Sequence, residues 1–447
     1  MKALLIDFGS TYTKVSLVNL DPPALIGTSR APTTTETGLL DGLNKALEAF
    51  TPEQLDGIEV KKACSSAAGG LRIVAIGLVP ELTVKAAREA ALGAGARVLA
   101  TYAYTLSDEE LDEIKELNPD LLLLSGGTDG GDRKNILENA ARIAESGLSV
   151  PVVVAGNKSA ASDVKKILAK SVPHVVVTKN VMPEINVLQV EPARQAIREL
   201  YLQEITKAKG LDVIQEEVGL AMPTPLAVMK AGELFNKVTG KEVVIVDVGG
   251  ATTDVHSFCE GKPRGSGVVL KGLPEPFAKR TVEGDLGMRV SLQTLLEVIE
   301  EQEDIQDLRD YADRIKRERS LIAANDREKY FDRIFATACI REALLRHSGR
   351  LNEVFTPEGR LWVQQGKDLT EIDILIGTGG ALVFADDASS LLRAGLRLEN
   401  PLHLTPRQPQ LMLDQNYILY AIGLLAEEYP ETAEALLKET LKPLGRI

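Results

Sequence analysis

Cysteine, aromatic residues and long apolar runs are all scarce in this chain of 447 residues, and each scarcity excludes a class of protein. The three cysteines, Cys64, Cys259 and Cys339, lie far apart and form no CxxC pair, which excludes a disulfide framework, a zinc ribbon and an all-cysteine iron–sulfur site within one chain. The apolar runs at residues 73–79 and 121–124 are much shorter than the roughly 18 residues of a membrane-spanning helix. Aromatic residues make up only 4% of the chain, which argues against base-stacking platforms.

Positive charge is also in short supply. The 51 Lys and Arg residues face 64 Asp and Glu residues, which gives a net charge of −13. Nucleic acids and anionic membranes attract basic surfaces, so neither is expected as the main partner. Asp7 places a carboxylate where a signal peptide would still be apolar, and together with the few cysteines this favours a reducing cytoplasm. At roughly 150 residues per domain, the length predicts two to four domains.

Apolar strands, glycine-containing turns and amphipathic helices alternate along the chain. From about residue 95 to residue 178, buried-type strands alternate with helices, an order that predicts a small parallel α/β unit. The pattern restarts at residue 242 with a strand, a Gly-Gly turn and a second strand. Residues 297–333 are densely charged and helical in character, which is typical of a solvated helix pair or of a partner-docking surface.

One short pattern occurs in both halves of the chain. An apolar strand leads into Asp7 and another into Asp247, and each is followed by Asp-x-Gly, small hydroxyl residues and a further strand. The separation between Gly9 and Gly249 equals that between the two aspartates, which indicates the duplication of one hairpin. A single copy is compatible with a plain turn, but the repetition favours a shared function. The candidate phosphate-binding residues are Gly9, Ser10, Thr11, Tyr12 and Lys14 in the first turn, and Gly249, Gly250, Thr252 and Thr253 in the second.

These residue types suit a nucleotide phosphate and its magnesium ion. Glycine brings backbone N–H groups close to phosphate oxygens, and Ser and Thr hydroxyls add donors without bulk. A carboxylate at a strand end can hold the waters of Mg²⁺, so Asp7 and Asp247 are the candidate catalytic and metal-binding residues. A third strand ends in Gly377, Gly379 and Gly380, where adenosine would lie against the backbone.

The order of turn, turn and glycine-rich strand resembles the actin-like ATPase superfamily, which includes sugar kinases and actin-like chaperones. The resemblance implies a two-lobed α/β fold of duplicated ribonuclease H-like type that clamps ATP and Mg²⁺ in a cleft. Residues 221–227 and 414–425 resemble the two connecting segments of that superfamily. Chaperone members carry a water-positioning Glu where this chain has Met222, which implies slow ATP hydrolysis.

A finer resemblance runs over essentially the whole chain. Residues 63–72, 124–131 and 281–289 are similar to the accessory protein family of glutamate (methylaspartate) mutase, the GlmL/MutL type. This resemblance implies a chaperone that uses ATP to exchange damaged for intact cobalamin on an adenosylcobalamin-dependent mutase. The four histidines show no metal-ligand spacing and no Asp-x-His-x-x-Gly cobalamin signature is present, so the cobalamin is expected on the partner. The expected domains are a first actin-like lobe at residues 1–94 and 181–228, an inserted α/β subdomain at 95–180 and a second lobe at 229–447.

Several other polar residues have both a functional and a structural interpretation. Residues 125–131 follow a buried strand and precede a helix, which suits an anion, the mutase or simply a tight turn. Glu283 and Asp285 are candidates to bind a nucleotide hydroxyl or magnesium-bound water, and the alternative is a salt-bridged turn. Candidates to face the nucleotide cleft, or else to form a buried turn, are Ser65, Ser66 and Arg72.

Two other functions fit the same fold. A small-molecule kinase would need a general base beside an acceptor hydroxyl, a role open to Asp247, although the sequence shows no acceptor pocket. An actin-like scaffold would couple nucleotide to assembly. The inserted α/β unit favours the chaperone, because neither ATP binding nor polymerisation requires that added surface. The sequence does not predict the oligomeric state.

Overall fold

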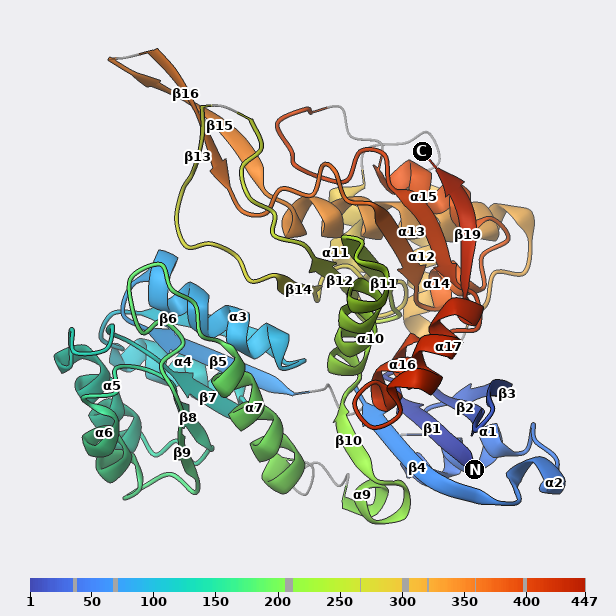
Figure 1. The fold of residues 1–447 in the computed structure, drawn as a ribbon, viewed down its shortest axis with the longest axis horizontal. Coiled ribbons are helices and arrows are strands. Elements are labelled where there is room, and N and C mark those ends of the chain that lie inside the picture. The colour runs from blue at the N-terminus through green and yellow to red at the C-terminus, as the bar shows by residue number, and fades with distance from the viewer. Residues whose placement is uncertain are drawn as a thin grey trace.

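The computed structural model shows two similar lobes and an inserted α/β unit (Figure 1). The residues that it describes are 1–34, 38–66, 71–205, 212–265, 267–299, 305–319, 321–357, 359–396 and 400–446. Residues 67–70 of the 63–72 motif, and residues 300–304 and 320 of the charged segment, therefore lie outside the described part. None of the described helices is both long and apolar enough to cross a membrane.

The first lobe is built on a mixed sheet of five strands. These strands are β1 (Lys2–Phe8), β2 (Tyr12–Leu20), β3 (Pro23–Pro32), β4 (Ile58–Ser65) and β10 (Leu220–Pro223). Their order is β10-β4-β1-β2-β3, with β1, β2 and β3 antiparallel and with β4 and β10 parallel to β1. The central strand β1 is apolar on both faces and is buried along almost its whole length, as expected for a strand covered by helices.

The second lobe repeats this sheet and adds one strand. Its strands are β11 (Val243–Val248), β12 (Thr253–Phe258), β14 (Ala278–Glu283), β17 (Ile374–Thr378), β18 (Gln410–Asp414) and β19 (Leu441–Arg446). The order is β14-β12-β11-β17-β18-β19, and its first five members repeat the strand directions of the first sheet. Asp7 pairs with Lys14 across the first hairpin as Asp247 pairs with Asp254 across the second. The predicted duplication and the two-lobed actin-like fold are therefore confirmed.

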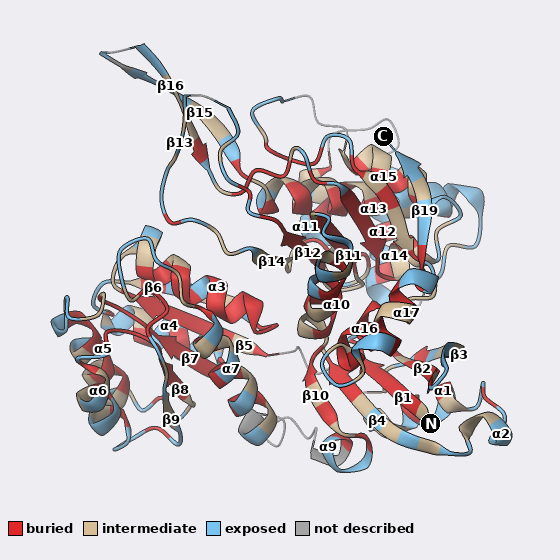
Figure 2. Cartoon of the chain, viewed as in Figure 1, coloured by how far each residue is buried: buried red, intermediate tan, exposed pale blue. Residues whose placement is uncertain are grey.

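Two helices connect the lobes and pack against each other. They are α10 (Thr224–Thr239) and α16 (Leu419–Leu425). Gly423 of α16 faces the backbone of α10, where an added Cβ would lie 1.8 Å from the carbonyl oxygen of Ala227. The apolar core around them takes residues from both sheets, so the connecting helices join the lobes through one shared core (Figure 2).

Each lobe carries further helices, and α17 (Pro430–Thr440) contributes Ala433, Leu436 and Leu437 to the core that the lobes share. The first lobe carries α1 (Leu39–Leu47), α2 (Pro52–Leu55) and α9 (Asp212–Val218). The second lobe carries α11 (Leu292–Val298), α12 (Ile305–Arg317), α13 (Asp326–His347), α14 (Gly380–Val383), α15 (Ala388–Leu396) and α17. A small sheet of β13 (Val268–Leu270), β15 (Arg350–Thr356) and β16 (Gly359–Gln365) projects from the second lobe as an arm (Figure 1).

The inserted unit is a parallel sheet with helices on both sides. Its strands are β5 (Arg72–Gly77), β6 (Arg97–Ala103), β7 (Leu121–Leu124), β8 (Val152–Val154) and β9 (Val175–Val177), in the order β6-β5-β7-β8-β9. Its helices are the π-helix η2 (Pro80–Val84), α3 (Lys85–Gly93), α4 (Asp108–Leu117), α5 (Lys134–Glu145), α6 (Ala161–Leu168) and α7 (Glu191–Leu200), which the π-helix η3 (Tyr201–Ile205) extends. The unit takes up β5 and α3, so it includes residues that precede the expected start at residue 95. The division of the chain into lobes stays a prediction, and its inserted part would have to begin by Arg72 to contain the whole sheet.

Candidate functional site

A cavity of about 680 Å³ lies between the lobes, where the two predicted phosphate turns face each other. The predicted residues that line it are Asp7, Gly9, Ser10, Thr11, Tyr12, Lys14, Asp247, Gly249, Gly250, Thr252 and Gly380. The turns approach closely, because a Cβ at Gly250 would lie 2.8 Å from Thr11 Oγ1. The two turns also close in the same way, since the Gly9 N–H donates to the Tyr12 carbonyl at 3.1 Å and the Gly249 N–H to the Thr252 carbonyl at 2.9 Å.

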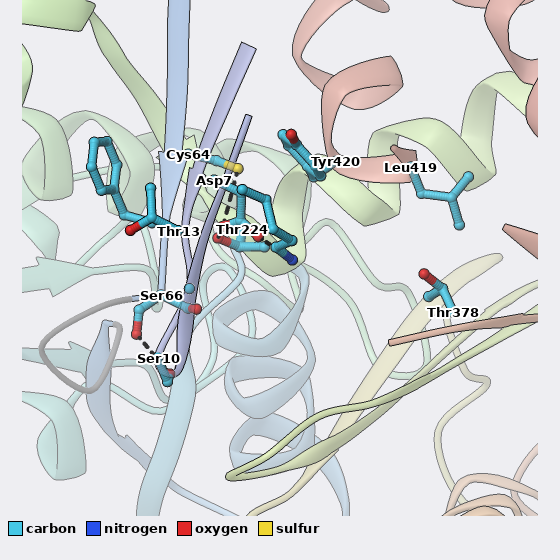
Figure 3. Close-up of polar contacts among 12 residues, drawn as sticks. Asp7, Ser10, Thr13, Cys64, Ser66, Thr224, Thr378, Leu419 and Tyr420 are labelled. Carbon is cyan, nitrogen blue, oxygen red and sulfur yellow. Dashed lines mark hydrogen bonds and ion pairs between the residues drawn. The ribbon is translucent and has the colours of Figure 1, made fainter. Parts of the chain in front are cut away.

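The first turn holds its aspartate in a buried polar cluster (Figure 3). Lys14 Nζ lies 2.5 Å from Asp7 Oδ2, and the Thr224 hydroxyl donates to Asp7 Oδ1 at 2.5 Å. Lys14 Nζ also lies 4.1 Å from the centre of the Tyr417 ring. Burial works to lower the pKa of Lys14, but the attraction of Asp7, Tyr417 and Asp247 prevails and raises that pKa well above its usual value. Lys14 therefore stays protonated beside the cavity, where its charge balances that of Asp7.

The second turn has the opposite electrostatics. Burial of the Asp247 carboxyl, with Asp254, Asp7 and Asp414 nearby, raises its pKa to about 7 although Lys14 opposes the shift. Asp254 accepts a hydrogen bond from the Thr252 hydroxyl at 3.1 Å and is ion-paired with Arg280 at 2.6 Å. A divalent cation beside Asp247 would favour its ionised form.

The carboxylates near the two turns determine how a magnesium ion would fit here. The described residues contain no group of three or more His, Cys, Asp or Glu side chains that could hold a metal ion by itself. Mg²⁺ in nucleotide sites is usually held by one or two carboxylates, several waters and the phosphates. Asp7 and Asp247, both on the cavity wall, fit that mode of binding.

The glycine-rich strand end contributes unequally to the cavity. Gly380 lines it, whereas Gly377 packs against Leu382 and Leu392 and is outside the wall. Gly379 has a φ of 90°, and a Cβ there would lie 2.6 Å from Asp247 Oδ1. Gly379 therefore permits β17 to end against the second turn rather than lining the cavity itself. The wall beside Gly380 continues through Ala381, Phe384, Asp386 and Tyr330.

Besides Gly377 and Gly379, three predicted site residues lie away from the cavity wall. The Thr253 hydroxyl is buried and donates to the Leu286 carbonyl at 2.7 Å. Glu283 and Asp285 both bind Arg346, at 3.0 and 2.7 Å, so the geometry favours the salt-bridged turn for this pair. Arg346 holds the pKa of Asp285 below its usual value, which is the expected effect of a hydrogen-bonded cation.

Of the other candidate segments, one part lines the cavity and the rest lies away from it. Ser65 and Ser66 line the cavity, and the Ser10 hydroxyl donates to the Ser66 carbonyl at 3.2 Å. Arg72 instead pairs with Asp120. The loop at residues 125–131 is closed by Asn157, whose side chain binds Gly130 N–H and the carbonyls of Gly131 and Asp132, and the loop is not part of the cavity wall.

Sequence reasoning missed several residues of the site. Thr224 and Tyr417 both contact the Asp7–Lys14 pair, and they come from the two segments that connect the lobes. Asp254 occupies in the second hairpin the place of Lys14 in the first, so the duplication itself was the signal that could have identified it. Arg280 could not have been found this way, because β14 is adjacent to β12 only in the folded sheet.

Comparisons with known proteins support the motif assignments. The family described as MutL protein matches residues 3–441. Protein MutL of Clostridium tetanomorphum is 45% identical over an aligned length of 460 residues. The alignment covers 98% of this chain and 98% of that protein.

Solved structures align with almost the whole chain, but their TM-scores are low. Component A of the Acidaminococcus fermentans (R)-2-hydroxyglutaryl-CoA dehydratase is 11% identical with a TM-score of 0.31, and covers 97% of this chain and 99% of its own. Xylulose kinase of Lactobacillus acidophilus is 12% identical with a TM-score of 0.34, and covers 99% and 93%. Family membership is therefore decided by the sequence matches and not by these structures. The chain therefore belongs to the MutL protein family, the glutamate mutase accessory family that its motifs resemble.

Proposed function

We propose that this protein is an ATP- and magnesium-dependent accessory protein that reactivates an adenosylcobalamin-dependent mutase, with glutamate mutase as the client. The observation that carries the proposal is the cavity between two duplicated phosphate turns, in a chain that is 45% identical to Protein MutL. The expected cytoplasmic setting and the cobalamin carried by the partner are parts of the same proposal.

The chain's own groups would hold the nucleotide from both sides. The residues of both turns line the cavity, and their backbone N–H groups and the hydroxyls of Ser10 and Thr252 would supply donors to the phosphates, while Lys14 adds a positive charge. Asp7 and Asp247 would hold the waters of a magnesium ion, which supplies charge neutralisation for the phosphates when it is bound. The wall beside Gly380 would receive the adenosine.

The two-lobed arrangement suits a nucleotide-dependent change of shape. ATP would contact both turns and hold the lobes together, whereas ADP, which lacks the γ-phosphate, would bridge them less well. A nucleotide can promote release of cobalamin only if one nucleotide state prefers the mutase conformation that has released it. The proposal therefore requires that the protein bind the mutase differently with ATP and with ADP.

The test is a reactivation assay. Glutamate mutase is inactivated with hydroxocobalamin, and this protein, Mg·ATP and fresh adenosylcobalamin are added. The expected result is a recovery of activity that needs all three additions and is lost with Asp7→Asn. The matched control is Asp112→Asn, because Asp112 is an exposed aspartate of α4 that pairs only with Lys115 among the described residues.

Two outcomes would contradict the proposal. Recovery that is equal without ATP would show that the nucleotide site is not used. No recovery with any cobalamin mutase of the host would favour the small-molecule kinase, which phosphorylation assays with candidate acceptors would then examine.

A further inference from the structure

The end of α3 and the turn into β6 lie against the supports of both phosphate turns. Arg280 of β14 reaches out of the second lobe, and its Nη1 donates to the Leu92 carbonyl at 3.2 Å and to the Ala96 carbonyl at 2.8 Å. Leu92 lies in the last turn of α3 and its carbonyl also accepts from the Gly95 N–H at 3.0 Å, whereas Ala96 lies in the turn that leads into β6. Figure 1 shows α3 of the inserted unit facing β14 across the boundary between them.

The same guanidinium also holds the second phosphate turn. Arg280 Nε donates to Asp254 Oδ1 at 2.8 Å, and Nη2 lies 2.6 Å from the same oxygen. The other oxygen of Asp254 accepts a hydrogen bond from Thr252, a residue of the turn. Arg280 is only 3% exposed, and Thr252, Asp254 and Arg280 together line one side of the cavity, so these charge-assisted hydrogen bonds connect the cavity wall to the inserted unit.

The first phosphate turn is reached from the same short segment. Gly95 has a φ of +86°, and a Cβ there would lie 3.0 Å from Pro223 and 3.2 Å from the backbone nitrogen of Leu226. These residues flank Thr224, whose hydroxyl donates to Asp7. A movement of either turn would therefore press on residues 92–97 of the inserted unit.

We infer that Arg280 is a positioning residue that transmits the nucleotide state of the cleft to the inserted α/β unit. Arg280 fits this role because its planar fork can bind a carboxylate and backbone carbonyls at once, a geometry that lysine cannot reproduce. This inference rests on the proposed function in one respect, since it requires a nucleotide in the cleft. The inference adds a route by which a nucleotide in the cleft would act on the inserted α/β unit.

The test compares hydrogen exchange of the full chain with Mg·ADP and with a magnesium complex of a non-hydrolysable ATP analogue. In the unmodified protein the amides of residues 92–97 are expected to exchange at rates that differ by at least about fivefold between the two states, the lower end of usual coupling between sites. Because Arg280 lines the cavity, each variant is measured at nucleotide concentrations that saturate it, and under these conditions the difference in exchange for Arg280→Lys is expected to fall below about twofold.

The matched control is Lys85→Met. Lys85 lies on α3, and its Nζ makes an ion pair with Glu275 of the second lobe at 3.0 Å. This pair therefore also joins the inserted unit to the second lobe, but Lys85 is outside the cavity wall. This variant is expected to keep the nucleotide-dependent difference. If Arg280→Lys fails to fold, Asp254→Asn breaks the same link from the other side and is expected to lose the difference.

The inference is overturned if Arg280→Lys or Asp254→Asn retains the difference, if Lys85→Met abolishes it, or if the unmodified protein binds both nucleotides without showing it. Failure of the proposed function is distinguishable by calorimetry and by the reactivation assay. Absence of nucleotide binding would reject both ideas. Intact transmission without reactivation of a mutase would reject the proposed function alone.

Discussion

Lys14 and Asp254 occupy equivalent places in the two hairpins but carry opposite charges. In the first turn the lysine neutralises the adjacent aspartate, and in the second Asp254 is neutralised by Arg280 from a neighbouring strand. Asp247 has no cation within ion-pairing distance in the described part of the chain, which explains why burial raises its pKa to about 7. The duplication therefore preserved the backbone of the turn while its electrostatics diverged.

The first prediction concerns the two strand-end carboxylates. Asp247→Asn is expected to weaken binding of Mg·ATP by about 10–100-fold, because it removes a charge that can hold the waters of the metal. Asp7→Asn is expected to have at least the same effect, since it also leaves Lys14 without its carboxylate partner. Calorimetric titration measures both affinities, and unchanged values for both variants would disprove the assignment of the cleft.

The second prediction is a pH dependence of the same binding. Because the pKa of Asp247 is raised to about 7, the carboxyl is largely protonated at pH 6 and largely ionised at pH 8. Magnesium needs the ionised form, so affinity for Mg·ADP should rise about tenfold between these pH values. The stability of the nucleotide-free protein should change in the opposite direction: the folded state binds the extra proton between the unfolded pKa and about 7, and this contribution is lost as pH rises through 7. Titrations at several pH values check the affinity, and Asp247→Asn should remove most of the trend.

At the scale of elements, the junction of β10 and α10 divides its side chains between the core and the cavity. Met222 ends up in the apolar core that the lobes share, at 3% exposure, and Thr224 two residues later contacts Asp7. Met222 therefore takes no part in the cavity wall, although the next three residues do.

The third prediction follows from that junction. The isolated protein should hydrolyse ATP slowly, because a missing water-orienting group typically costs about 10²–10⁴-fold in rate. A phosphate-release assay measures the basal rate. Turnover of about ten per second, the median for enzymes, would show that another residue orients the attacking water.

The crossing of the two connecting helices yields the fourth prediction. Gly423→Ala should lower the free energy of unfolding by about 1–3 kcal/mol, because the added methyl group would lie against the Ala227 carbonyl and force the helices apart. Thermal or denaturant unfolding measures the change. Lys438→Ala on the exposed side of α17 is the control and should change stability by less than about 0.5 kcal/mol. An equal effect of both variants would contradict the close crossing.

At the scale of the whole molecule, the lobes meet at the cleft as well as in the core around their connecting helices. Thr11 approaches Gly250, and Arg30 of the first lobe lies 3.5 Å from the centre of the Phe384 ring of the second. The inserted unit adds the Arg280 contacts on one side of the cleft, so three parts of the chain meet around one cavity.

The fifth prediction concerns closure of that cavity. A non-hydrolysable ATP analogue with Mg²⁺ should make the protein more compact than ADP does, because the γ-phosphate reaches both turns. Small-angle scattering measures the radius of gyration in each state. Asp247→Asn, at nucleotide concentrations that saturate the unmodified protein, should show a smaller difference. Identical scattering with both nucleotides would argue against closure.

Much of this architecture could be predicted from short patterns in the sequence. The Asp-x-Gly turns specify their own hairpins, because glycine closes the turn locally and an apolar strand must be buried. The structure places Asp7, Lys14, Asp247 and the turn glycines on the wall of one cavity, and their role in nucleotide binding stays a prediction. The expected start of the inserted unit at residue 95 leaves out β5, because the sequence of a strand does not show which sheet it joins.

What the sequence by itself determined is therefore the repeated turn, the two-lobed fold and the family. Only the tertiary structure decided which polar groups share an environment. It placed Arg280 between Asp254 and the end of α3, and it bound Glu283 and Asp285 to Arg346 away from the cavity. The physical reason is that turn geometry depends on adjacent residues, whereas electrostatic partners and burial depend on segments that meet only after the sheets have formed.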